Sequence, residues 1–476
     1  MGAVVMENDI NRRFLQMLGW EGEELESFIP DWELAAKFLS LTDKDIQNAV
    51  ENWIPKYWDI SLLSVRKMIA ACVRETAELA KMNRYKAEGK KILYVNNTSL
   101  FACVYANKLA GHGELHFAYP DFIMTTMWQA FCGKSEGQFP GKPALNPACG
   151  HCALNCTRAT TNMDGYVPEP TATWNWGLHC NEAPKTEELI DCLCQRDEQA
   201  DVLTAIPHDA PLGEIEAEND ERVAFLAAQI REGQQRVSEL TGIMVTDQDL
   251  RDGIEAYMAY MRRVEKLTDL VVNADPQPIS GIELALFSLN MQVCFDSGMD
   301  YVNDALDTAI AEVEDRIRRG VGNLPKGAPR LACHFAPLNV PWVDRAFRDN
   351  GVNLSLGRVF PLASWMEEAI KHDDDPYIAA ARMCLMWPDA VNMKNEAEIV
   401  IKLFEHYSFD GALFGFYDFD RWIGALQKTM IRIVEERTGI PHYYLEGEFW
   451  DGCRYNIDNR ISIIRSICSC LKISNL

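Results

Sequence analysis

The sequence predicts an α/β protein with two Rossmann-like parallel-sheet domains joined by a helical bridge, preceded by an N-terminal helical section. Three changes of pattern predict it. Short apolar runs alternate with helical segments from Lys91, the chain is almost wholly helical from about Asn219, and the alternation returns near Arg330. Alternating strands and helices are typical of parallel sheets covered by helices. The predicted parts are residues 1–90 (N-terminal helical section), 91–218 (first α/β domain), 219–325 (helical bridge) and 326–476 (second α/β domain).

The N-terminal section contains two clear helix starts. Leu41-Thr42-Asp43 begins one helix, and Ser61 opens a longer one whose apolar residues recur at helical spacing. Large aromatic side chains here either pack against the next domain or form a partner-binding face, and we expect packing. They are Trp20, Trp32, Trp53 and Trp58.

The first α/β domain has three predicted strands, and the segment between the second and third carries most of the chemistry. The strands are residues 91–96, 116–119 and 201–206. In parallel sheets, ligands bind beyond the carboxyl ends of the strands. The cysteine-containing stretch 146–180 is expected to be one long irregular insertion, the kind of loop in which function is usually found.

The bridge and the second α/β domain follow the same logic. Helices are expected from 221 to 240, from Thr246 to about 267, and from about Ser280 and Asp300. Beyond them, predicted strands are 330–334, 352–356, 411–416 and 442–445, with helices from about 340, from 364, and over 399–406, 421–436 and 460–471. Neither G-x-G-x-x-G nor G-x4-G-K-[ST] occurs, so the sequence lacks the fingerprints of dinucleotide and nucleoside-triphosphate binding.

Four thiols lie within one short stretch of the first domain. Cys149, Cys152 and Cys156 have C-x2-C-x3-C spacing, and Cys180 follows after a gap. Three such sulfurs can reach one point, and a fourth from a later loop completes a tetrahedral set. The pattern favours an iron–sulfur cluster held by these four cysteines, with Cys132 and Cys333 in reserve. His151, His179 and Asn155 are candidate hydrogen-bond donors to cluster sulfurs.

Other chemistries remain open for these thiols. Cys149-Gly-His-Cys152 is also a C-x-x-C dithiol of the kind used in disulfide exchange. The thiols could instead bind zinc if His179-Cys180 supplies a second knuckle. Buried cysteines also often act as small apolar residues. Four scattered cysteines in helical or apolar stretches are expected to be packing residues: Cys72, Cys103, Cys294 and Cys384. We assign no role to Cys468 and Cys470 in the last helix.

Composition excludes several classes of partner. The 476-residue chain has 46 Lys and Arg against 70 Asp and Glu, a net charge of −24, which argues against nucleic acid. No apolar run is long enough for a membrane span. Fifteen cysteines without a secretory leader predict a reducing cytoplasm.

Several motifs resemble the 2-hydroxyacyl-CoA dehydratase / benzoyl-CoA reductase family. These are Leu240-Thr-Gly, Val245-Thr-Asp-Gln-Asp-Leu-Arg-Asp-Gly-Ile254, Arg262-Arg263, Asp275-Pro-Gln-Pro-Ile-Ser-Gly-Ile-Glu283, Phe409-Asp-Gly-Ala-Leu-Phe414, Gly439-Ile-Pro-His-Tyr-Tyr-Leu-Glu-Gly-Glu448 and Asn459-Arg460. The resemblance covers roughly residues 185–470. It implies a subunit with a [4Fe-4S] cluster, or a double-cubane cluster in one branch, between two Rossmann-like domains.

The resemblance also implies a reaction and partners. A separate ATPase activator with its own cluster passes an electron to this subunit, and an acyl-CoA thioester is reduced to a ketyl radical that loses its 2-hydroxyl as water or begins ring reduction. A homologous second subunit, or a second copy of the chain, completes the enzyme. One departure is that Tyr417-Asp418-Phe419 carries no thiol where the family often supplies a ligand. This leaves two alternatives, a non-catalytic or electron-relay subunit and a double-cubane reductase of small unsaturated molecules.

Overall fold

The structure is a computed structural model. It describes residues 9–96, 100–134, 152–177, 182–195, 200–206, 220–334, 340–388, 393–416, 421–447 and 456–474. Of the four predicted cluster ligands, Cys152 and Cys156 lie within these ranges, whereas Cys149 and Cys180 lie outside them.

The N-terminal section is helical, as predicted. Its elements are α1 (Ile10–Leu18), α2 (Gly22–Phe38), α3 (Asp43–Asn48), the π-helix η2 (Ala49–Trp53), α4 (Ile54–Tyr57), α5 (Leu63–Ala80) and α6 (Met82–Ala87). Thr42 caps α3 in a reciprocal capping box with Asp45, which satisfies amides that have no partner within the helix. Trp20, Trp32 and Trp58 are buried, so this set of tryptophans serves packing, as expected.

The first sheet has four parallel strands in the order β2-β1-β3-β4. In chain order its elements are β1 (Lys91–Val95), α7 (Phe101–Gly111), β2 (Leu115–Ala118), α8 (Pro120–Thr126), the π-helix η3 (Met127–Cys132), α9 (Ala153–Met163), β3 (Ala172–Gly177), α10 (Glu182–Cys194) and β4 (Asp201–Ala205). Leu93 on β1 is in register with Phe117 and Ala172, one on each neighbouring strand. The chain therefore enters the sheet at β1, near its middle.

One sequence expectation for this domain is wrong. Residues 146–180 were expected to form a single irregular insertion, but they contain the helix α9 and the strand β3. Strand β3 pairs with both β1 and β4, so it is central to the sheet. Cys156 consequently lies in the first helical turns of α9, and Cys152 occupies the position that caps it.

The bridge is helical, as predicted. It consists of α11 (Asp220–Thr241), α12 (Asp247–Asn273), α13 (Gly281–Phe287), the short 3₁₀ helix η7 (Leu289–Met291) and α14 (Asp300–Arg319). Thr246 with Asp249 and Ser280 with Glu283 form capping boxes at the starts of α12 and α13. Helix α12 packs along α7 of the first domain, and α14 packs against α5 of the N-terminal section.

The second sheet repeats the topology of the first, with parallel strands in the order β6-β5-β7-β8. Its elements are β5 (Arg330–His334), α15 (Pro341–Asp349), β6 (Asn353–Leu356), α16 (Ala363–Ile370), α17 (Pro376–Leu385), α18 (Met393–His406), β7 (Gly411–Phe416), α19 (Arg421–Thr438), β8 (His442–Glu446) and α20 (Ile457–Ser474). In both sheets the first strand of the domain lies between the second and the third. The predicted fold class, two parallel α/β domains with a helical bridge and N-terminal helices, is confirmed.

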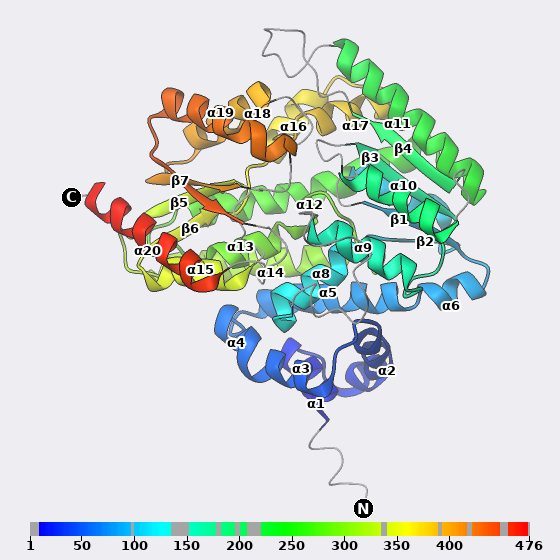
Figure 1. Cartoon of the computed structure of the whole chain (residues 1–476), viewed down its shortest axis with the longest axis horizontal. Coiled ribbons are helices and arrows are strands. Elements are labelled where there is room, and N and C mark those ends of the chain that lie inside the picture. Colours follow the sequence, from blue (N-terminus) through cyan, green and yellow to red (C-terminus); the bar gives the residue numbers. More distant parts are fainter. Residues whose placement is uncertain are drawn as a thin grey trace, which may run out of the picture.

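Figure 1 shows the two sheets on opposite sides of α12–α14, with α1–α4 gathered below α5. One apolar core runs through the N-terminal section, the first sheet, the bridge and one side of the second sheet. A smaller core lies between the second sheet, α15 and α20. Within the described residues, no helix is both long and apolar enough to cross a membrane.

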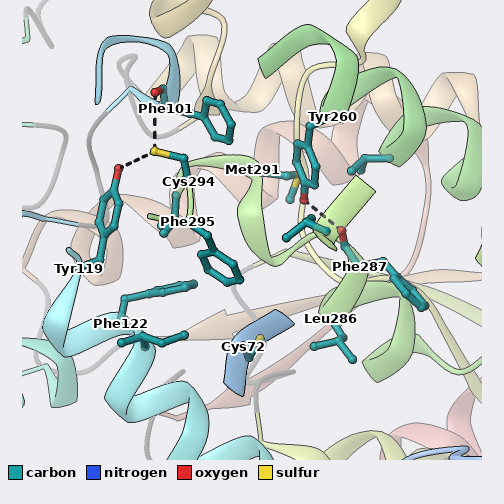
Figure 2. Packing of buried hydrophobic residues seen from close by; sticks show 14 of the residues in the cluster. Cys72, Phe101, Tyr119, Phe122, Tyr260, Leu286, Phe287, Met291, Cys294 and Phe295 are labelled. Atoms are coloured by element: carbon teal, nitrogen blue, oxygen red, sulfur yellow. Dashed lines mark hydrogen bonds between the residues drawn. The ribbon is translucent and has the colours of Figure 1, made fainter. Parts of the chain in front are cut away.

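The scattered cysteines pack in this core, as predicted. Cys72, Cys103, Cys294 and Cys384 are all buried. Figure 2 shows Cys294 between Tyr119, whose hydroxyl lies 3.8 Å from its sulfur, and the carbonyl of Phe101 at 4.0 Å. Burial raises the pKa of these thiols, so they remain protonated and behave as small apolar side chains.

Candidate functional site

The middle of the first sheet's carboxyl edge is a natural ligand position. From β1 the chain continues to β2 on one side of β1, and it then crosses to β3 on the other side. The strand order therefore reverses between β1 and β3. Ligands of open α/β sheets bind in the crevice beyond such a reversal. Asn96, which follows β1 and is fully buried, spans it: its side-chain amide donates to the carbonyl of Trp176 on β3 at 3.2 Å and accepts from the amide of Trp176 at 3.3 Å.

Cys152 and Cys156 are placed at this edge by α9. Because residues 164–171 connect the end of α9 to the start of β3, the beginning of α9 lies at the same edge as the end of β3. Cys152 is partly exposed and has extended backbone angles, and the amide of Cys156 donates to its carbonyl at 3.0 Å. Cys156 is buried against Ala159 and Ile190. The spacing thus puts one sulfur at the helix start and the other one turn further along.

Arg158 of α9 contacts both β3, which precedes Cys180 in the chain, and α10, which follows it. Cys180 lies three residues after Gly177, the end of β3, and three before Ala183 in α10. The guanidinium of Arg158 in α9 donates to the carbonyl of Ala183 at 3.3 Å. Cys149 lies three residues before Cys152. Cys149 and Cys180 themselves lie outside the described residues, so their place relative to α9 stays a prediction.

A buried charge network surrounds Arg158. Its guanidinium donates to Asn155 at 2.7 Å and lies 3.7 Å from a carboxylate oxygen of Asp121 and 3.6 Å from one of Glu187. Burial raises the pKa of Asp121, although Arg158 opposes this. Burial, and next the charge of Glu187, raises the pKa of Asp201 to about 7. Sequence reasoning missed this network because its members come from α8, α9, α10 and β4, and no local motif links them.

The structure places the remaining predicted site residues as follows. Asn155 is buried and its side-chain oxygen accepts from Arg158, so it anchors α9. His151 and His179 lie outside the described residues. Cys132 is buried at the end of η3, and burial raises its pKa to about 12. Cys333 is fully buried within β5 with its pKa raised by burial. Burial thus disfavours the thiolate form of both reserve candidates.

The corresponding edge of the second sheet carries a histidine that sequence reasoning missed. His334 is the last residue of β5, next to the reversal of strand order between β5 and β7. It is fully buried, and its Nε2 lies 2.9 Å from a carboxylate oxygen of Glu396 at the start of α18. The available signal was its position as the last residue of a predicted strand.

A small cavity lies between η3 and the bridge. It has a volume of about 20 Å³, enough for one water molecule. Its lining residues are Trp58, Thr125, Thr126, Gln129, Ala130, Ile282, Leu286 and Leu289. The buried hydroxyl of Thr126 has no hydrogen-bond partner among the described residues. Thr125, which also lines the cavity, donates its hydroxyl to that of Thr157 in α9 at 3.4 Å, so α8 contacts α9 and continues into η3.

Two other polar sites do not have the character of ligand sites. An open groove of about 390 Å³ between α12 and α14 has three cations along it. Each of the three has a carboxylate partner: Arg262 with Glu367, Arg263 with Asp307 and Lys266 with Glu314. The groove therefore lacks the unpaired positive charge that an anion needs.

The second polar site is a cluster of three side chains that could bind a metal ion, and it lies away from the carboxyl ends of the strands of the first sheet. Ligand atoms of Glu78, His116 and Asp296 lie within 4.8 Å of one another. Nδ1 of His116 lies 2.7 Å from Asp296, the ammonium of Lys108 lies 3.1 Å from the other oxygen of Asp296, and Glu78 accepts from the hydroxyl of Tyr85 at 2.5 Å. Because protein donors, among them the ammonium groups of Lys108 and Lys81, already occupy these carboxylates, we interpret the group as an ion-pair network that joins α5 to β2.

The two parallel sheets have the same topology, so the protein consists of two Rossmann-like halves. Its candidate site lies at the reversal of strand order in the first sheet, where α9 begins with Cys152 and Cys156. The family model of the 2-hydroxyglutaryl-CoA dehydratase D-component matches residues 187–463. Because this is more than half of the chain, the chain belongs to that family, and the predicted resemblance is confirmed.

A curated relative supports the same family. The chain is 27% identical over 163 residues to one of the subunits of benzoyl-CoA reductase from Thauera aromatica. The matched stretch covers 32% of this chain and 38% of that relative. The family is one of acyl-CoA dehydratases and reductases, which supports an enzymatic role.

Proposed function

We propose that the chain is the iron–sulfur subunit of an anaerobic enzyme that acts on acyl-CoA thioesters by one-electron reduction. Dehydration of a 2-hydroxyacyl-CoA is the first choice of reaction, and aromatic-ring reduction the second. The predicted cluster ligands are Cys149, Cys152, Cys156 and Cys180. The observation that carries the proposal is the placement of Cys152 and Cys156 at the start of α9, at the reversal of strand order in the first sheet, within a chain of this family.

The described residues at this position fit a cluster. Cys152 is partly exposed and precedes a helix N-terminus, where amide dipoles stabilise the negative charge of a thiolate-ligated cluster. Arg158 holds α9 in place through Asn155 and the carbonyl of Ala183. When bound, an iron–sulfur cluster would supply one-electron transfer and a Lewis-acidic iron for a substrate oxygen. The chain's own residues would fix its position and limit the access of water.

The proposal includes partners and a compartment. The curated relative is named as a subunit of its enzyme, which supports a homologous second subunit or a second copy of this chain. We propose an ATPase activator with its own cluster as electron donor, because the sequence has no phosphate-binding loop and ketyl formation needs a low potential. A reducing cytoplasm suits the free thiols of such a protein.

Metal analysis of the anaerobically purified chain tests the proposal. We expect a brown protein that contains iron and acid-labile sulfide. The substitution Cys152→Ser should reduce iron retention by at least about 10-fold, since even outer-shell partners of metal ligands have effects of that size. Cys192→Ser is the matched control, because Cys192 is an exposed cysteine of α10. Stoichiometric zinc without iron, or equal iron in both variants, would refute the proposal.

A second candidate function is an electron-relay subunit without a substrate site. The observation that favours it is the segment Tyr417-Asp418-Phe419 after β7, which has no thiol. The two candidates differ in the coordination of the cluster. An iron that changes its spectroscopic signature when 2-hydroxyacyl-CoA is added supports direct substrate binding, whereas a cluster that is indifferent to the thioester supports the relay. A double-cubane reductase is the third candidate, and about twice the iron per chain would indicate it.

A further inference from the structure

The two halves of the chain have equivalent positions along three strands. The first residue of β3 pairs with Leu93 of β1, and the first residue of β7 pairs with Leu331 of β5. In both sheets the second residue of the third strand then pairs with the first residue of the fourth strand. Leu93 and Leu331 are therefore equivalent. So are Asn96 and His334, which lie three residues further along the chain.

The helix that precedes the third strand is also equivalent in the two halves. It is α9 in the first half and α18 in the second, and each packs against the helix that follows the third strand, α10 or α19 (Figure 1). Cys156 is the fourth residue of α9, and Glu396 is the fourth residue of α18. The second half thus has a carboxyl group at the place where the first half has a thiol.

The equivalent residues at the two strand ends differ in their chemistry. Asn96 and His334 are both fully buried, each beside the reversal of strand order in its sheet. Asn96 uses both polar groups of its amide on the backbone of Trp176. Nε2 of His334 instead lies 2.9 Å from a carboxylate oxygen of Glu396. The second half therefore has, in place of a structural amide, a side chain that can bind and release a proton near neutral pH.

The surroundings of the pair suit it to acid–base chemistry. The side chain of Glu396 is 19% exposed, so water reaches the carboxylate, whereas His334 is fully buried. Glu396 lies in the first turn of α18, where the helix dipole favours a negative charge. A carboxylate beside an imidazole fixes the ring and stabilises its protonated form. The ring of Phe414 on β7 also packs edge-on against the imidazole, with 6.3 Å between the ring centroids.

We infer that His334 and Glu396 form an acid–base pair that exchanges a proton with an acyl-CoA ligand at the carboxyl edge of the second sheet. Ligands of open parallel sheets bind beyond this edge, at the reversal of strand order. The inference rests on the proposed function and deepens it. The first half holds the thiols of the proposed cluster, and the second half holds the proton of the reaction.

Dehydration of a 2-hydroxyacyl-CoA needs one such pair. After one-electron reduction of the thioester, the C2–O bond breaks with its electron pair on oxygen, which takes the proton of the imidazolium and leaves as water. The neutral imidazole then takes the proton that C3 loses, and the added electron returns to its donor. The products are an enoyl-CoA and water, and the pair is again protonated.

The test compares two His–Glu pairs of the second half. His334→Asn introduces the side chain of the equivalent position in the first half, and Glu396→Gln removes the charge at nearly constant shape. The control pair is His442 and Glu435, 3.2 Å apart, because His442 is the first residue of β8 and so lies at the opposite edge of the sheet. Its variants are His442→Asn and Glu435→Gln. Thermal unfolding of all four variants reports any loss of stability.

We expect kcat of the activated holoenzyme with a 2-hydroxyacyl-CoA to fall by about 100-fold or more in His334→Asn, with the KM and iron content of the wild type. Glu396→Gln should lie between this variant and the wild type. In the wild type kcat should fall as rising pH removes the proton of the imidazolium. In Glu396→Gln this fall should begin at lower pH, because the charge that stabilises the imidazolium is gone. A merely structural pair would leave the pH profile unchanged, as we expect for both control variants.

A second measurement needs no turnover. In protein with isotope-labelled histidine, a 2-hydroxyacyl-CoA should move the ring resonance of His334, identified by its loss in His334→Asn, and not that of His442. A wild-type chain without iron and sulfide would refute the proposed function, and this measurement then decides the inference. A resonance of His334 that the thioester does not move would overturn the inference. So would wild-type kinetics in His334→Asn, or an equal loss of kcat in His442→Asn.

Discussion

Arg158 shows how one residue can organise a site. Its guanidinium is buried and contacts Asn155, the carbonyl of Ala183, and the carboxyl groups of Asp121 and Glu187. A buried charge is tolerated where it is paired and hydrogen-bonded. Burial raises the pKa of Asp121 in this network, and burial, with next the charge of Glu187, raises the pKa of Asp201 to about 7. Asp201 is therefore the carboxyl group of this network whose proton binding falls near neutral pH.

The pH dependence of stability should report the protonation of Asp201. An unfolded chain loses this proton near pH 3.9 and the folded protein near pH 7, so its stabilising contribution is present at low pH and is lost as the pH rises through about 7. We expect Asp201→Asn to make the free energy of unfolding less dependent on pH between about 4 and 7, the interval between the two pKa values. The carbonyl oxygen of the new amide can still accept from Asn175, which now bonds to Asp201 at 2.6 Å.

Chemical denaturation at a series of pH values measures this effect. Asp220→Asn, at an exposed position in the first turn of α11, is the control and should keep the wild-type pH profile. Glu75 adds a second contribution of the same sign in every variant, since burial and Asp296 raise its pKa to about 8. A profile of Asp201→Asn that matches the wild type would contradict a raised pKa of Asp201.

At the residue scale, the sequence could predict the thiols and not their surroundings. The spacing of Cys149, Cys152 and Cys156 is visible in the chain, because three side chains within eight residues are neighbours in any local conformation. The contacts of Arg158 join residues 37 positions earlier and 29 positions later. Contacts of this kind depend on how α8, α9 and α10 pack on the sheet. Neither the composition nor the periodicity of the sequence predicts them.

Among the elements that sequence reasoning missed, α9 and β3 bear most directly on the candidate site. Ten of the 11 residues of α9 are buried, among them several polar ones, so the helix has no solvent-exposed face that would make its sequence read as an amphipathic surface helix. It also contains five threonine or asparagine residues, which have low helix propensity, and Cys152 makes no side-chain capping bond. Strand β3 holds Asn175 between two tryptophans, and this buried amide is tolerated because it bonds to Asp201.

Where periodicity was strong, the predicted elements are confirmed. Helix α12 has a capping box at Thr246 and a regular apolar face, and the structure gives it 27 residues. The sequence did not show what this face contacts. Gly253 lies where α12 crosses α7, and a Cβ atom there would lie 2.3 Å from the carbonyl oxygen of Ala102. A backbone atom cannot move aside as a side chain can, so the crossing requires glycine.

The substitution Gly253→Ala should therefore destabilise the protein despite the higher helix propensity of alanine. Alanine favours an exposed helix by up to about 1 kcal/mol over glycine, but overpacking of a buried contact costs about 1–3 kcal/mol or more. We expect a lower midpoint in thermal and denaturant unfolding. Asp252→Ala, at the exposed neighbouring position, is the control and should change stability little. Equal or higher stability of Gly253→Ala would show that the two helices can separate freely.

At the scale of the whole molecule, the hydrophobic core does not follow the four sequence segments. The division at residues 90, 218 and 325 stays a prediction drawn from changes of pattern. The larger core includes residues from Ile10 to Val434, and thus joins the N-terminal section, the first sheet, the bridge and part of the second sheet. Contacts between distant segments hold these parts together, among them Glu312 of α14, which accepts from the amides of Leu63 and Ser64 at the start of α5.

A shared core predicts shared unfolding. Domains with separate cores unfold independently, whereas segments that bury their apolar surface against one another lose it together. We expect hydrogen exchange in increasing denaturant to show the same dependence for peptides from α2, β3 and α12, since none of these elements can open without exposing the larger core. Helix α20 is the internal control. It packs in the smaller core on the outer side of the second sheet (Figure 1) and should open at lower denaturant. If α2 opened well before α12, the N-terminal section would be an independent unit, and the core contacts through Trp58 and α5 would contribute little to its stability.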